Sequence, residues 1–343
     1  MEQLSVAIIG AGDIAGGYDE KKHHGDDGVY SHAGAYAKHG GFTLRTVCDM
    51  DKVRAENFCC IWKASAPFAS LDEICVRFHD VVSVCTPDHT HFGIVRDILA
   101  AGCCRTVFVE KPLGNEPSQI EELIRLAKEK NIHLVVNFQR RIESQHREIR
   151  EVIQSSPDNL LSATGCYMKG LRHIGVTMID TLCYIFGYPD AVLAFNRVFN
   201  HETEDFSYEF VLFYPRFTVA VKTTDAERFY YNYHIFEIDL LLRDRRWALV
   251  NISQGLRESP VTPYSYSEVN IINDREAQYR ETSYKSSMLD TVGYIHDITK
   301  GRLPHVVNTP QSSWNNLQII SRIIESYEGG SVKIQFEHEL WKR

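Results

Sequence analysis

Lys111 is the residue of this sequence that is best placed for proton chemistry. It comes two positions after Thr106–Val109, an apolar run typical of a parallel strand that is buried on both faces. Open α/β sheets bind their ligands at the carboxyl ends of such strands. An ammonium group there can donate a hydrogen bond to a substrate hydroxyl, favour its alkoxide and pass on a proton. We therefore predict a catalytic role for Lys111; the alternative is an ordinary lysine on a surface loop.

A glycine-rich turn close to the N-terminus predicts a dinucleotide site. The turn, Gly10–Gly16, directly follows the apolar run Val6–Ile9, and its spacing fits the G-x-G-x-x-G/A fingerprint. Gly10 permits the tight turn, and Gly12 lets the backbone approach a pyrophosphate. Free N–H groups at the helix start that follows attract the phosphate charge. The predicted cofactor contacts in this turn are Gly10, Gly12, Asp13 and Ile14.

Asp49 decides the expected form of the cofactor. It ends the run Phe42–Cys48, the second predicted strand. An acidic residue at this place commonly bonds the ribose hydroxyls and repels a 2′-phosphate, which favours NAD. NADP is the less favoured alternative, because Arg54 lies only five positions further on.

A polar insertion at residues 17–29 separates the glycine turn from the next helical pattern. It lengthens the gap to Asp49 beyond the usual distance of about 20 residues. The pair His23-His24 lies inside the insertion, and no further ligands stand nearby in the sequence. We predict a solvated loop and a candidate lid here, with no metal site.

Four segments, taken together and in this order, resemble the Gfo/Idh/MocA oxidoreductases. They are Gly10–Ala15, Thr86–His91, Glu110-Lys111-Pro112 and Asn137–Arg141. That family is named for glucose-fructose oxidoreductase, inositol dehydrogenase and a rhizopine-catabolism protein. The similarity continues through residues 169–187 and 325–334, so it covers nearly the whole chain. The Glu-Lys-Pro triplet at a strand end is its most specific mark.

The resemblance implies both a fold and a chemistry. Similar proteins pair a Rossmann domain with an open antiparallel sheet, and they oxidise or reduce sugars and cyclitols with a nicotinamide cofactor. His91 is expected either to line the nicotinamide side of the site or to be a satisfied histidine near a helix start. The cofactor contacts that the resemblance adds are Thr86, Pro87, His91, Glu110 and Lys111.

A second stretch with catalytic potential runs from Tyr167 to Asp180. If a helix begins near His173, then His173, Thr177 and Asp180 stand at i, i+4 and i+7 on one face. The common family pattern has Asp at the first position and His at the second. Since Thr177 cannot act as a base near neutral pH, we predict that His173 or Tyr167 relays the proton; a buried structural histidine is the alternative. The predicted substrate contacts are Lys111, Arg140, Lys169, His173, Thr177 and Asp180.

The remaining pattern predicts an α/β chain of two domains. Strands alternate with helices up to residue 139, as in a doubly wound parallel Rossmann sheet. Beyond Arg141 several runs alternate apolar and polar residues, as in an open, mainly antiparallel sheet with one wet face. We predict a dinucleotide-binding domain at 1–139 and an α+β domain for substrate binding and oligomerisation at 140–343. The final helix, 309–328, is an element that could pack back on the first domain.

Composition excludes several kinds of partner. The chain of 343 residues has 37 Lys+Arg against 45 Asp+Glu, a net charge of −8, which disfavours nucleic acid and acidic membranes. No apolar run is long enough to span a bilayer, and the N-terminus lacks a signal-peptide layout. The nine cysteines include no C-x-x-C pair, as expected of reduced thiols. We therefore expect a cytoplasmic protein, and the resemblance implies a homodimer or homotetramer formed through the C-terminal sheet.

The resulting prediction is an NAD(P)-dependent oxidoreductase that interconverts a secondary alcohol and a ketone. Its expected substrate is a sugar, a cyclitol or a nucleotide-linked sugar. Two alternatives stay open from the sequence. One is an NAD-dependent glycosidase that uses a transient keto sugar, and the other is a catalytically silent nicotinamide-binding sensor.

Overall fold

The chain forms two compact units. The computed structural model describes residues 3–68, 70–225, 234–265, 268–337 and 341. The first unit comprises Met1–Ile142 with Lys285–Trp314, and the second comprises Glu143–Tyr284 with Asn315–Arg343. The predicted division after residue 139 lies close to Ile142, where the chain first passes from the first unit to the second. The structure differs from the prediction at 285–314, which group with the first unit.

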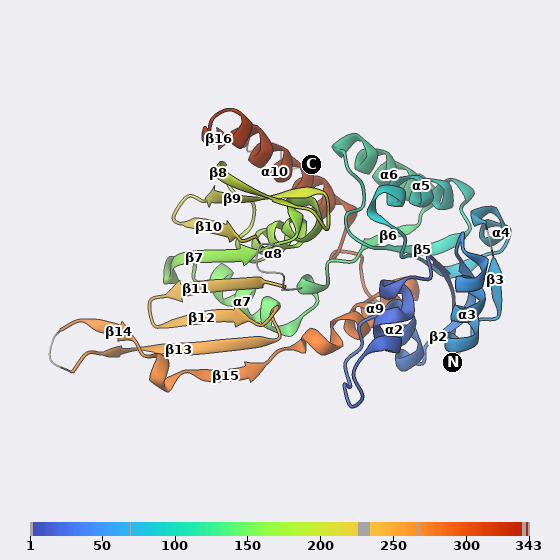
Figure 1. The fold of residues 1–343 in the computed structure, drawn as a ribbon, viewed down its shortest axis with the longest axis horizontal. Coiled ribbons are helices and arrows are strands. Elements are labelled where there is room, and N and C mark those ends of the chain that lie inside the picture. The colour runs from blue at the N-terminus through green and yellow to red at the C-terminus, as the bar shows by residue number, and fades with distance from the viewer. Residues whose placement is uncertain (1–2, 69, 226–233, 266–267, 338–340, 342–343) are drawn as a thin grey trace. The chain divides into compact units, whose positions relative to one another are not determined.

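The first unit is built on a six-stranded parallel sheet with the order β3-β2-β1-β4-β5-β6 (Figure 1). This order is that of the predicted doubly wound Rossmann sheet, so the predicted fold class is confirmed for this unit. The inner strands β1, β4 and β5 bury all but one residue each, because helices cover both faces of the sheet. The strands are β1 (Leu4–Ile9), β2 (Phe42–Cys48), β3 (Ala66–Phe68), β4 (His79–Val84), β5 (Cys104–Val109) and β6 (His133–Val136).

Helices of the first unit lie on both faces of this sheet. Helices α5 (His91–Ala101) and α6 (Pro117–Lys130) lie together on one face, and α2 (His32–His39) and α9 (Ser287–Thr299) lie on the other (Figure 1). Helix α9 buries its apolar residues, Met288, Val292, Ile295 and Ile298, in the core formed with α2 and the sheet. This burial explains why 285–314 belong with the first unit. The short helices α1 (Tyr18–Lys21) and α4 (Leu71–Cys75) and helix α3 (Lys52–Trp62) complete the unit.

The insertion at 17–29 is anchored at both of its ends. Its first part is helix α1, where the sequence predicted only a loop. The Asp19 carboxylate accepts hydrogen bonds from the backbone N–H groups of Tyr30 and Ser31 and from the Ser31 hydroxyl. The backbone N–H of Val29 donates a hydrogen bond of 2.8 Å to the carbonyl oxygen of Lys285. These contacts fasten the insertion to the start of α2 and to the segment before α9.

Asp19 is expected to stabilise this anchored insertion. Replacing Asp19 with alanine should lower the free energy of unfolding by about 1–3 kcal/mol, because it leaves largely buried donors at Tyr30 and Ser31 unsatisfied. Urea unfolding measures the loss. Asp27→Ala is the matched control: its carboxylate is 87% exposed and pairs only loosely with Lys285, at 3.7 Å, so its removal should cost less than about 0.5 kcal/mol. Equal losses in the two variants would show that Asp19 is not the anchor.

The second unit contains a mixed, mainly antiparallel sheet with the order β14-β13-β12-β11-β7-β10-β9-β8-β16. The β7–β10 pair is parallel, and β15 pairs antiparallel with β13 outside this path. The predicted open sheet is therefore confirmed. Its strands are β7 (Leu160–Tyr167), β8 (Ala191–Asn200), β9 (Asp205–Phe213), β10 (Thr218–Thr223), β11 (Phe236–Leu242), β12 (Arg245–Val250), β13 (Gly255–Pro263), β14 (Asn270–Ile272), β15 (Gln278–Glu281) and β16 (Ile334–Gln335).

Two helices, α7 (Ser144–Ser155) and α8 (Val176–Phe186), pack against each other within the second unit. Helix α8 is almost fully buried, as its apolar sequence indicates. The last helix, α10 (Pro310–Glu328), matches the predicted 309–328, and the division between units falls near its first turn.

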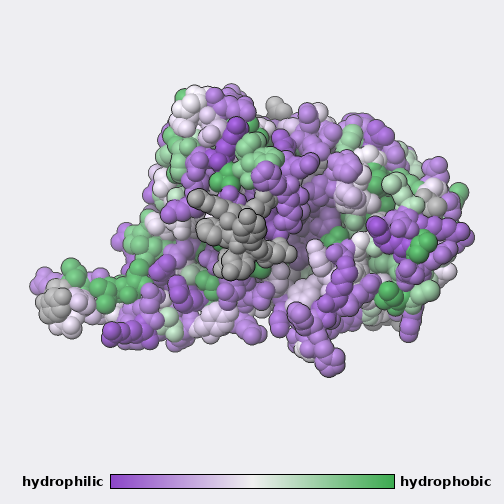
Figure 2. Space-filling view, viewed as in Figure 1, coloured by the Kyte–Doolittle hydropathy of each residue, from purple (hydrophilic) through white to green (hydrophobic). Residues whose placement is uncertain are grey.

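Of the helices described, none is long and apolar enough to cross a membrane. Apolar side chains are exposed near the tip of the β13–β14 hairpin, Val269 and Ile271 among them (Figure 2).

Candidate active site

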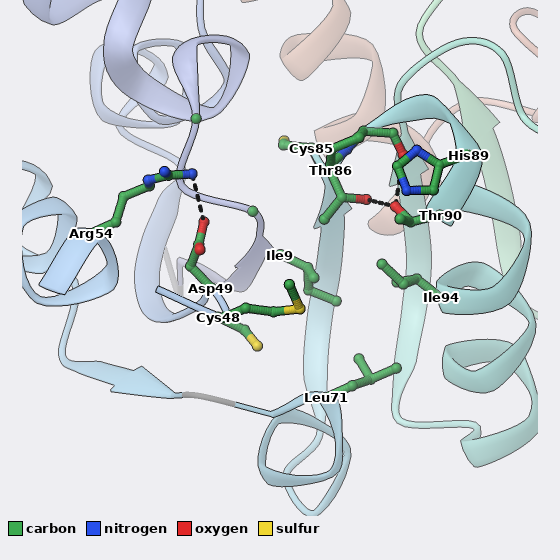
Figure 3. A pocket seen from close by; sticks show the side chains of 14 residues that line it. Ile9, Cys48, Asp49, Arg54, Leu71, Cys85, Thr86, His89, Thr90 and Ile94 are labelled. Carbon is green, nitrogen blue, oxygen red and sulfur yellow. Dashed lines mark hydrogen bonds and ion pairs between the residues drawn. The ribbon is translucent and has the colours of Figure 1, made fainter. Parts of the chain in front are cut away.

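A cavity of about 570 Å³ lies in the first unit at the carboxyl ends of β1, β2 and β4 (Figure 3). Parallel α/β sheets bind ligands at this edge, where the strand order reverses. Three sequence segments meet here: the glycine turn, the end of β2 and the segment after β4. The lining residues are Ile9, Gly10, Gly12, Cys48, Asp49, Met50, Arg54, Leu71, Cys85, Thr86, Pro87, His89, Thr90 and Ile94.

The glycine turn has the backbone that a dinucleotide site needs. Gly10 has a φ of +88°, and a Cβ atom there would lie 2.7 Å from the carbonyl oxygen of Cys85, so only glycine fits. At Gly12 a Cβ atom would meet nothing within 4 Å and would instead stand in the cavity. The predicted roles of the two glycines thus agree with their surroundings. Asp13 and Ile14 begin the helical turn Asp13–Gly17, and the Asp13 carboxylate pairs with Lys21.

Asp49 lines the cavity with its carboxylate held by the backbone. Its Oδ2 accepts a hydrogen bond from the Ala11 N–H at 2.8 Å, and its Oδ1 accepts one from the Asp51 N–H at 2.9 Å. Arg54 approaches the carboxylate at 3.8 Å (Figure 3). The negative charge is therefore fixed beside the glycine turn, while the guanidinium is largely exposed and can move.

The segment after β4 lies opposite Asp49, and hydrogen bonds of its hydroxyl groups hold it in shape. Thr90 donates one hydrogen bond of 2.7 Å to the Thr86 hydroxyl and is also 2.7 Å from the Pro87 carbonyl oxygen (Figure 3). Thr86 and Pro87, two of the predicted cofactor contacts, line the cavity. His91, in contrast, is fully buried behind this segment and does not line the cavity.

The largely buried Glu110 side chain directly follows β5 and accepts hydrogen bonds from two neighbouring segments of the chain. Its Oε1 accepts hydrogen bonds from Asn137 at 2.6 Å and from the ring of His32 at 2.9 Å. Burial alone would raise the pKa of Glu110, but these hydrogen bonds and the nearby charges of His32 and Lys111 hold it below its usual value. Sequence reasoning missed His32, because nothing near the start of α2 indicates that it contacts a strand end about 80 residues away.

Lys111 follows Glu110 at the carboxyl end of the sheet and is half-buried. Burial lowers the pKa of Lys111 from its ordinary value, against the opposing pull of the Glu110 and Asp88 carboxylates. A lysine with a lowered pKa exchanges its proton at a pH nearer to neutral, as proton-transfer chemistry requires. Arg140, the other predicted substrate contact of this unit, is buried in the short helical turn Gln139–Arg141.

His173 lies in the second unit, in a wide helical turn, Gly170–Gly175, that precedes α8. Asp205 is close enough for the charge of His173 to act on it. Burial raises the pKa of Asp205, although hydrogen bonds from the backbone N–H groups of Arg172 and Phe206, and the charges of Arg172 and His173, pull it lower. The two side chains therefore lie within electrostatic range of each other. Asp205 was not predicted, because it stands 32 positions further along the sequence.

Two predicted site residues of the second unit have structural contacts instead. The Tyr167 hydroxyl is fully buried, donates to the carbonyl oxygen of Tyr208 and accepts from its N–H at 2.7 Å. The Asp180 carboxylate is also fully buried and accepts a hydrogen bond from Asn316 of α10 at 2.9 Å. These placements argue against a proton relay at Tyr167 and against a substrate contact at Asp180.

The other two predicted contacts of this unit are partly exposed. Lys169 has a left-handed backbone conformation and pairs with Glu202 at 3.1 Å. Thr177 stands on the first turn of α8, where its carbonyl oxygen accepts a hydrogen bond from the Thr181 hydroxyl. Among the residues that the structure describes, no group of three His, Cys, Asp or Glu side chains could hold a metal ion.

Comparison with protein families assigns the first unit. Residues 4–138 match the Gfo/Idh/MocA oxidoreductase family, described as having an NAD-binding Rossmann fold. The sheet order, the glycine turn and the cavity agree with that description. Residues 4–138 thus belong to this family of oxidoreductases with an NAD-binding Rossmann fold, which confirms for this part of the chain the family predicted from the sequence.

Individual relatives agree with this assignment. The D-glucoside 3-dehydrogenase of Escherichia coli K12 is 28% identical over 212 residues, which are 54% of this chain and 55% of that protein. An uncharacterised oxidoreductase of the same organism, YhhX, is 29% identical over 46% of this chain and 50% of its own length. The chain therefore matches only about half the length of these curated relatives.

Solved structures share the fold of the whole chain. The WlbA dehydrogenase of Bordetella pertussis, in complex with NADH and UDP-GlcNAcA, has a TM-score of 0.73 at 14% identity, over 98% of this chain and 99% of that one. An oxidoreductase of Agrobacterium radiobacter, in complex with NAD⁺, L-tartaric acid and magnesium, has a TM-score of 0.71 at 14% identity, over 97% and 98%. At this identity the similarity concerns the fold alone.

Proposed function

We propose that this protein is an NAD-dependent dehydrogenase that interconverts a secondary alcohol and a ketone on a sugar, a cyclitol or a nucleotide-linked sugar. The observation that carries the proposal is Lys111, a lysine of lowered pKa in the same unit as the glycine turn and its cavity. The D-glucoside 3-dehydrogenase supports a carbohydrate substrate. The complex of WlbA with UDP-GlcNAcA supports the nucleotide-linked alternative.

The residues that line the cavity fit the adenosine and pyrophosphate part of NAD, and Lys111 would act on the substrate. Gly10, Gly12 and Asp49 would hold the adenosine and pyrophosphate part, with Thr86 and Pro87 on the opposite wall of the cavity. Bound NAD accepts the hydride from the carbon that carries the hydroxyl group. The Lys111 ammonium would donate a hydrogen bond to the substrate oxygen and stabilise its alkoxide form.

His173 is the residue that we propose as proton acceptor, with Asp205 orienting its ring. Since Thr177 has no basic group, the imidazole of His173 is the side chain of this stretch whose ordinary pKa is closest to neutral pH. Lys169 and Thr177 are proposed substrate contacts of the same unit, and Arg140 of the first.

A screen of sugars, cyclitols and nucleotide sugars with NAD⁺ tests the proposed reaction, with NADH absorbance as the readout. Mass spectrometry of ligands retained on the purified protein narrows the panel. Oxidation of at least one compound supports the proposal. Release of a free sugar without net NADH formation would instead indicate a glycosidase, and tight NADH binding without any turnover would indicate a sensor.

Asp49 is expected to make the site selective for NAD. The wild-type protein should bind NADH at least about tenfold more tightly than NADPH, because a 2′-phosphate beside a fixed carboxylate is repelled. Asp49→Asn should remove most of this difference, while Asp51→Asn, a nearby exposed carboxylate, should preserve it. Fluorescence titration with both reduced cofactors measures the ratio. Equal or tighter NADPH binding by the wild type would mean that Arg54 overrides Asp49.

We further propose that the chain acts in the cytoplasm as a homodimer or homotetramer. All nine cysteines are free thiols, as expected in a reducing compartment. Large apolar side chains are exposed on two strands of the second unit, at Leu161 of β7 and at Phe195 and Phe199 of β8. An assembly through this sheet would cover these side chains. Light scattering tests the association, and a monomer at micromolar concentration would contradict it.

A further inference from the structure

His91 connects two segments of the first unit that carry predicted site residues. It is the first residue of α5 and is fully buried. Its Nδ1 lies 2.7 Å from the carbonyl oxygen of Pro112, directly after Lys111. Its Nε2 lies 2.8 Å from the carbonyl oxygen of Thr86, which lines the cavity. One imidazole therefore spans the end of β4 and the segment that follows β5.

Both partners of this ring are hydrogen-bond acceptors. A carbonyl oxygen cannot donate, so each ring nitrogen must carry a hydrogen for its bond to form. A neutral imidazole carries only one N–H, and its other nitrogen would direct a lone pair at a carbonyl oxygen. We propose that His91 is a positioning residue that is held as an imidazolium, and that its two N–H groups fasten the Thr86 segment to the Lys111-Pro112 segment.

The surroundings of the ring decide the balance between charged and neutral forms. Burial and the start of α5 both oppose a positive charge, because the ring is shielded from water and the helix dipole is positive there. Two hydrogen bonds of 2.7 and 2.8 Å oppose these effects, and their lengths are those of charge-assisted bonds, about 2.7–2.9 Å. A neutral ring would leave one nitrogen lone pair facing a carbonyl oxygen in a site closed to water, so the two directed bonds are the larger contribution.

The ionisable groups on the neighbouring segments include charges of both signs. Asp88 and His89 lie in the turn before α5, and Cys85 lies at the end of β4. Glu110 and Lys111 precede Pro112, and Glu110 is bound by His32 of α2. Asp88 and Glu110 both act on the Lys111 ammonium, so negative charge is already present on the two segments that His91 connects.

The consequence concerns the geometry of the predicted cofactor and proton-transfer sites. Loss of one ring proton would release either Thr86 or Pro112, and thus loosen the cavity wall or the backbone next to Lys111. The part of this inference that concerns Lys111 rests on the proposed function. The protonation of His91 and its effect on NADH binding do not depend on turnover.

Histidine side-chain NMR on the ¹⁵N-labelled full-length protein tests the protonation state near neutral pH. We expect both ring nitrogens of His91 to carry slowly exchanging protons. His79 is the internal control: it is buried in the same unit, its Nε2 lies 3.3 Å from one carbonyl oxygen, and its Nδ1 has no partner among the described residues. Burial lowers the pKa of His79, so its ring should be neutral. An unprotonated ring nitrogen on His91 would overturn the inference.

A variant tests the positioning role independently. A glutamine side chain has one donor group only, so His91→Gln should weaken NADH binding about tenfold, the effect of losing one charge-assisted bond. The matched control, His79→Gln, should bind NADH within about twofold of the wild type. Unchanged NADH affinity in folded His91→Gln would refute the positioning role, whereas an imidazolium in a protein that oxidises no alcohol would refute only the proposed function.

Discussion

Replacing Lys111 with alanine is expected to lower kcat by about 10²–10⁴-fold, the usual range for a positioned proton-transfer group. The fold and the affinity for NADH should be nearly unchanged, because the proposed partner of the ammonium is the substrate hydroxyl and the cavity that would take the adenosine part is lined by other residues. Steady-state kinetics with the best substrate of the panel and NADH titration of the same preparation measure the two effects. Lys128→Ala, which removes an exposed lysine of α6, is the matched control and should be silent.

The pH dependence of kcat provides a second readout for Lys111. The ammonium is the active form in alcohol oxidation, so activity should fall as pH rises through the pKa of Lys111. Since burial lowers this pKa, the alkaline limb should lie below the ordinary lysine value of about 10.4. The limb should be absent from the residual activity of Lys111→Ala. Near wild-type turnover in that variant would show that Lys111 is not the central residue.

The parallel sheet was predictable because the largely apolar composition of its strands indicates that they are buried. Runs such as Val6–Ile9 and Val81–Val84 are fully or nearly fully buried, so their composition alone indicates strands covered on both faces. β3 was missed, since it has only three residues. The membership of 285–314 was missed for a different reason: the apolar positions of α9 indicate a helix but do not indicate which core they enter.

The placement of candidate site residues at strand ends was predictable, whereas the contacts of those chosen by side-chain chemistry alone were not. Glu110, Lys111 and Asp49 follow buried strands, and strand ends meet at one edge of a parallel sheet. Tyr167 and Asp180 look equally reactive in the sequence, but their partners, Tyr208 and Asn316, are distant in the chain. Only the tertiary structure shows that these polar groups are already satisfied, which is the usual state of buried polar side chains.

His173→Asn is expected to lower kcat by about 10²–10⁴-fold, because oxidation of an alcohol requires a group that accepts the hydroxyl proton. Imidazole can do so only when neutral, so wild-type activity should fall at acidic pH. The variant should lose this acid limb. Asp205→Asn keeps one oxygen acceptor, for either the Arg172 or the Phe206 N–H group, and removes the charge that favours the imidazolium. It should therefore shift the acid limb to lower pH and reduce kcat less.

Two further variants separate the chemistry of His173 from a structural role. Adding Thr177→His to His173→Asn places an imidazole one helical turn later, on a side chain that is also half-buried, and partial recovery of kcat is expected if both positions reach the reacting hydroxyl. Tyr167→Phe should instead reduce stability with little effect on kcat, since its hydroxyl is bound to the backbone of Tyr208 on β9. A silent His173→Asn together with an inactive but folded Tyr167→Phe would reverse the assignment and make the phenol the relay. Silence in both would leave water as the acceptor of the hydroxyl proton, with Lys111 stabilising the alkoxide.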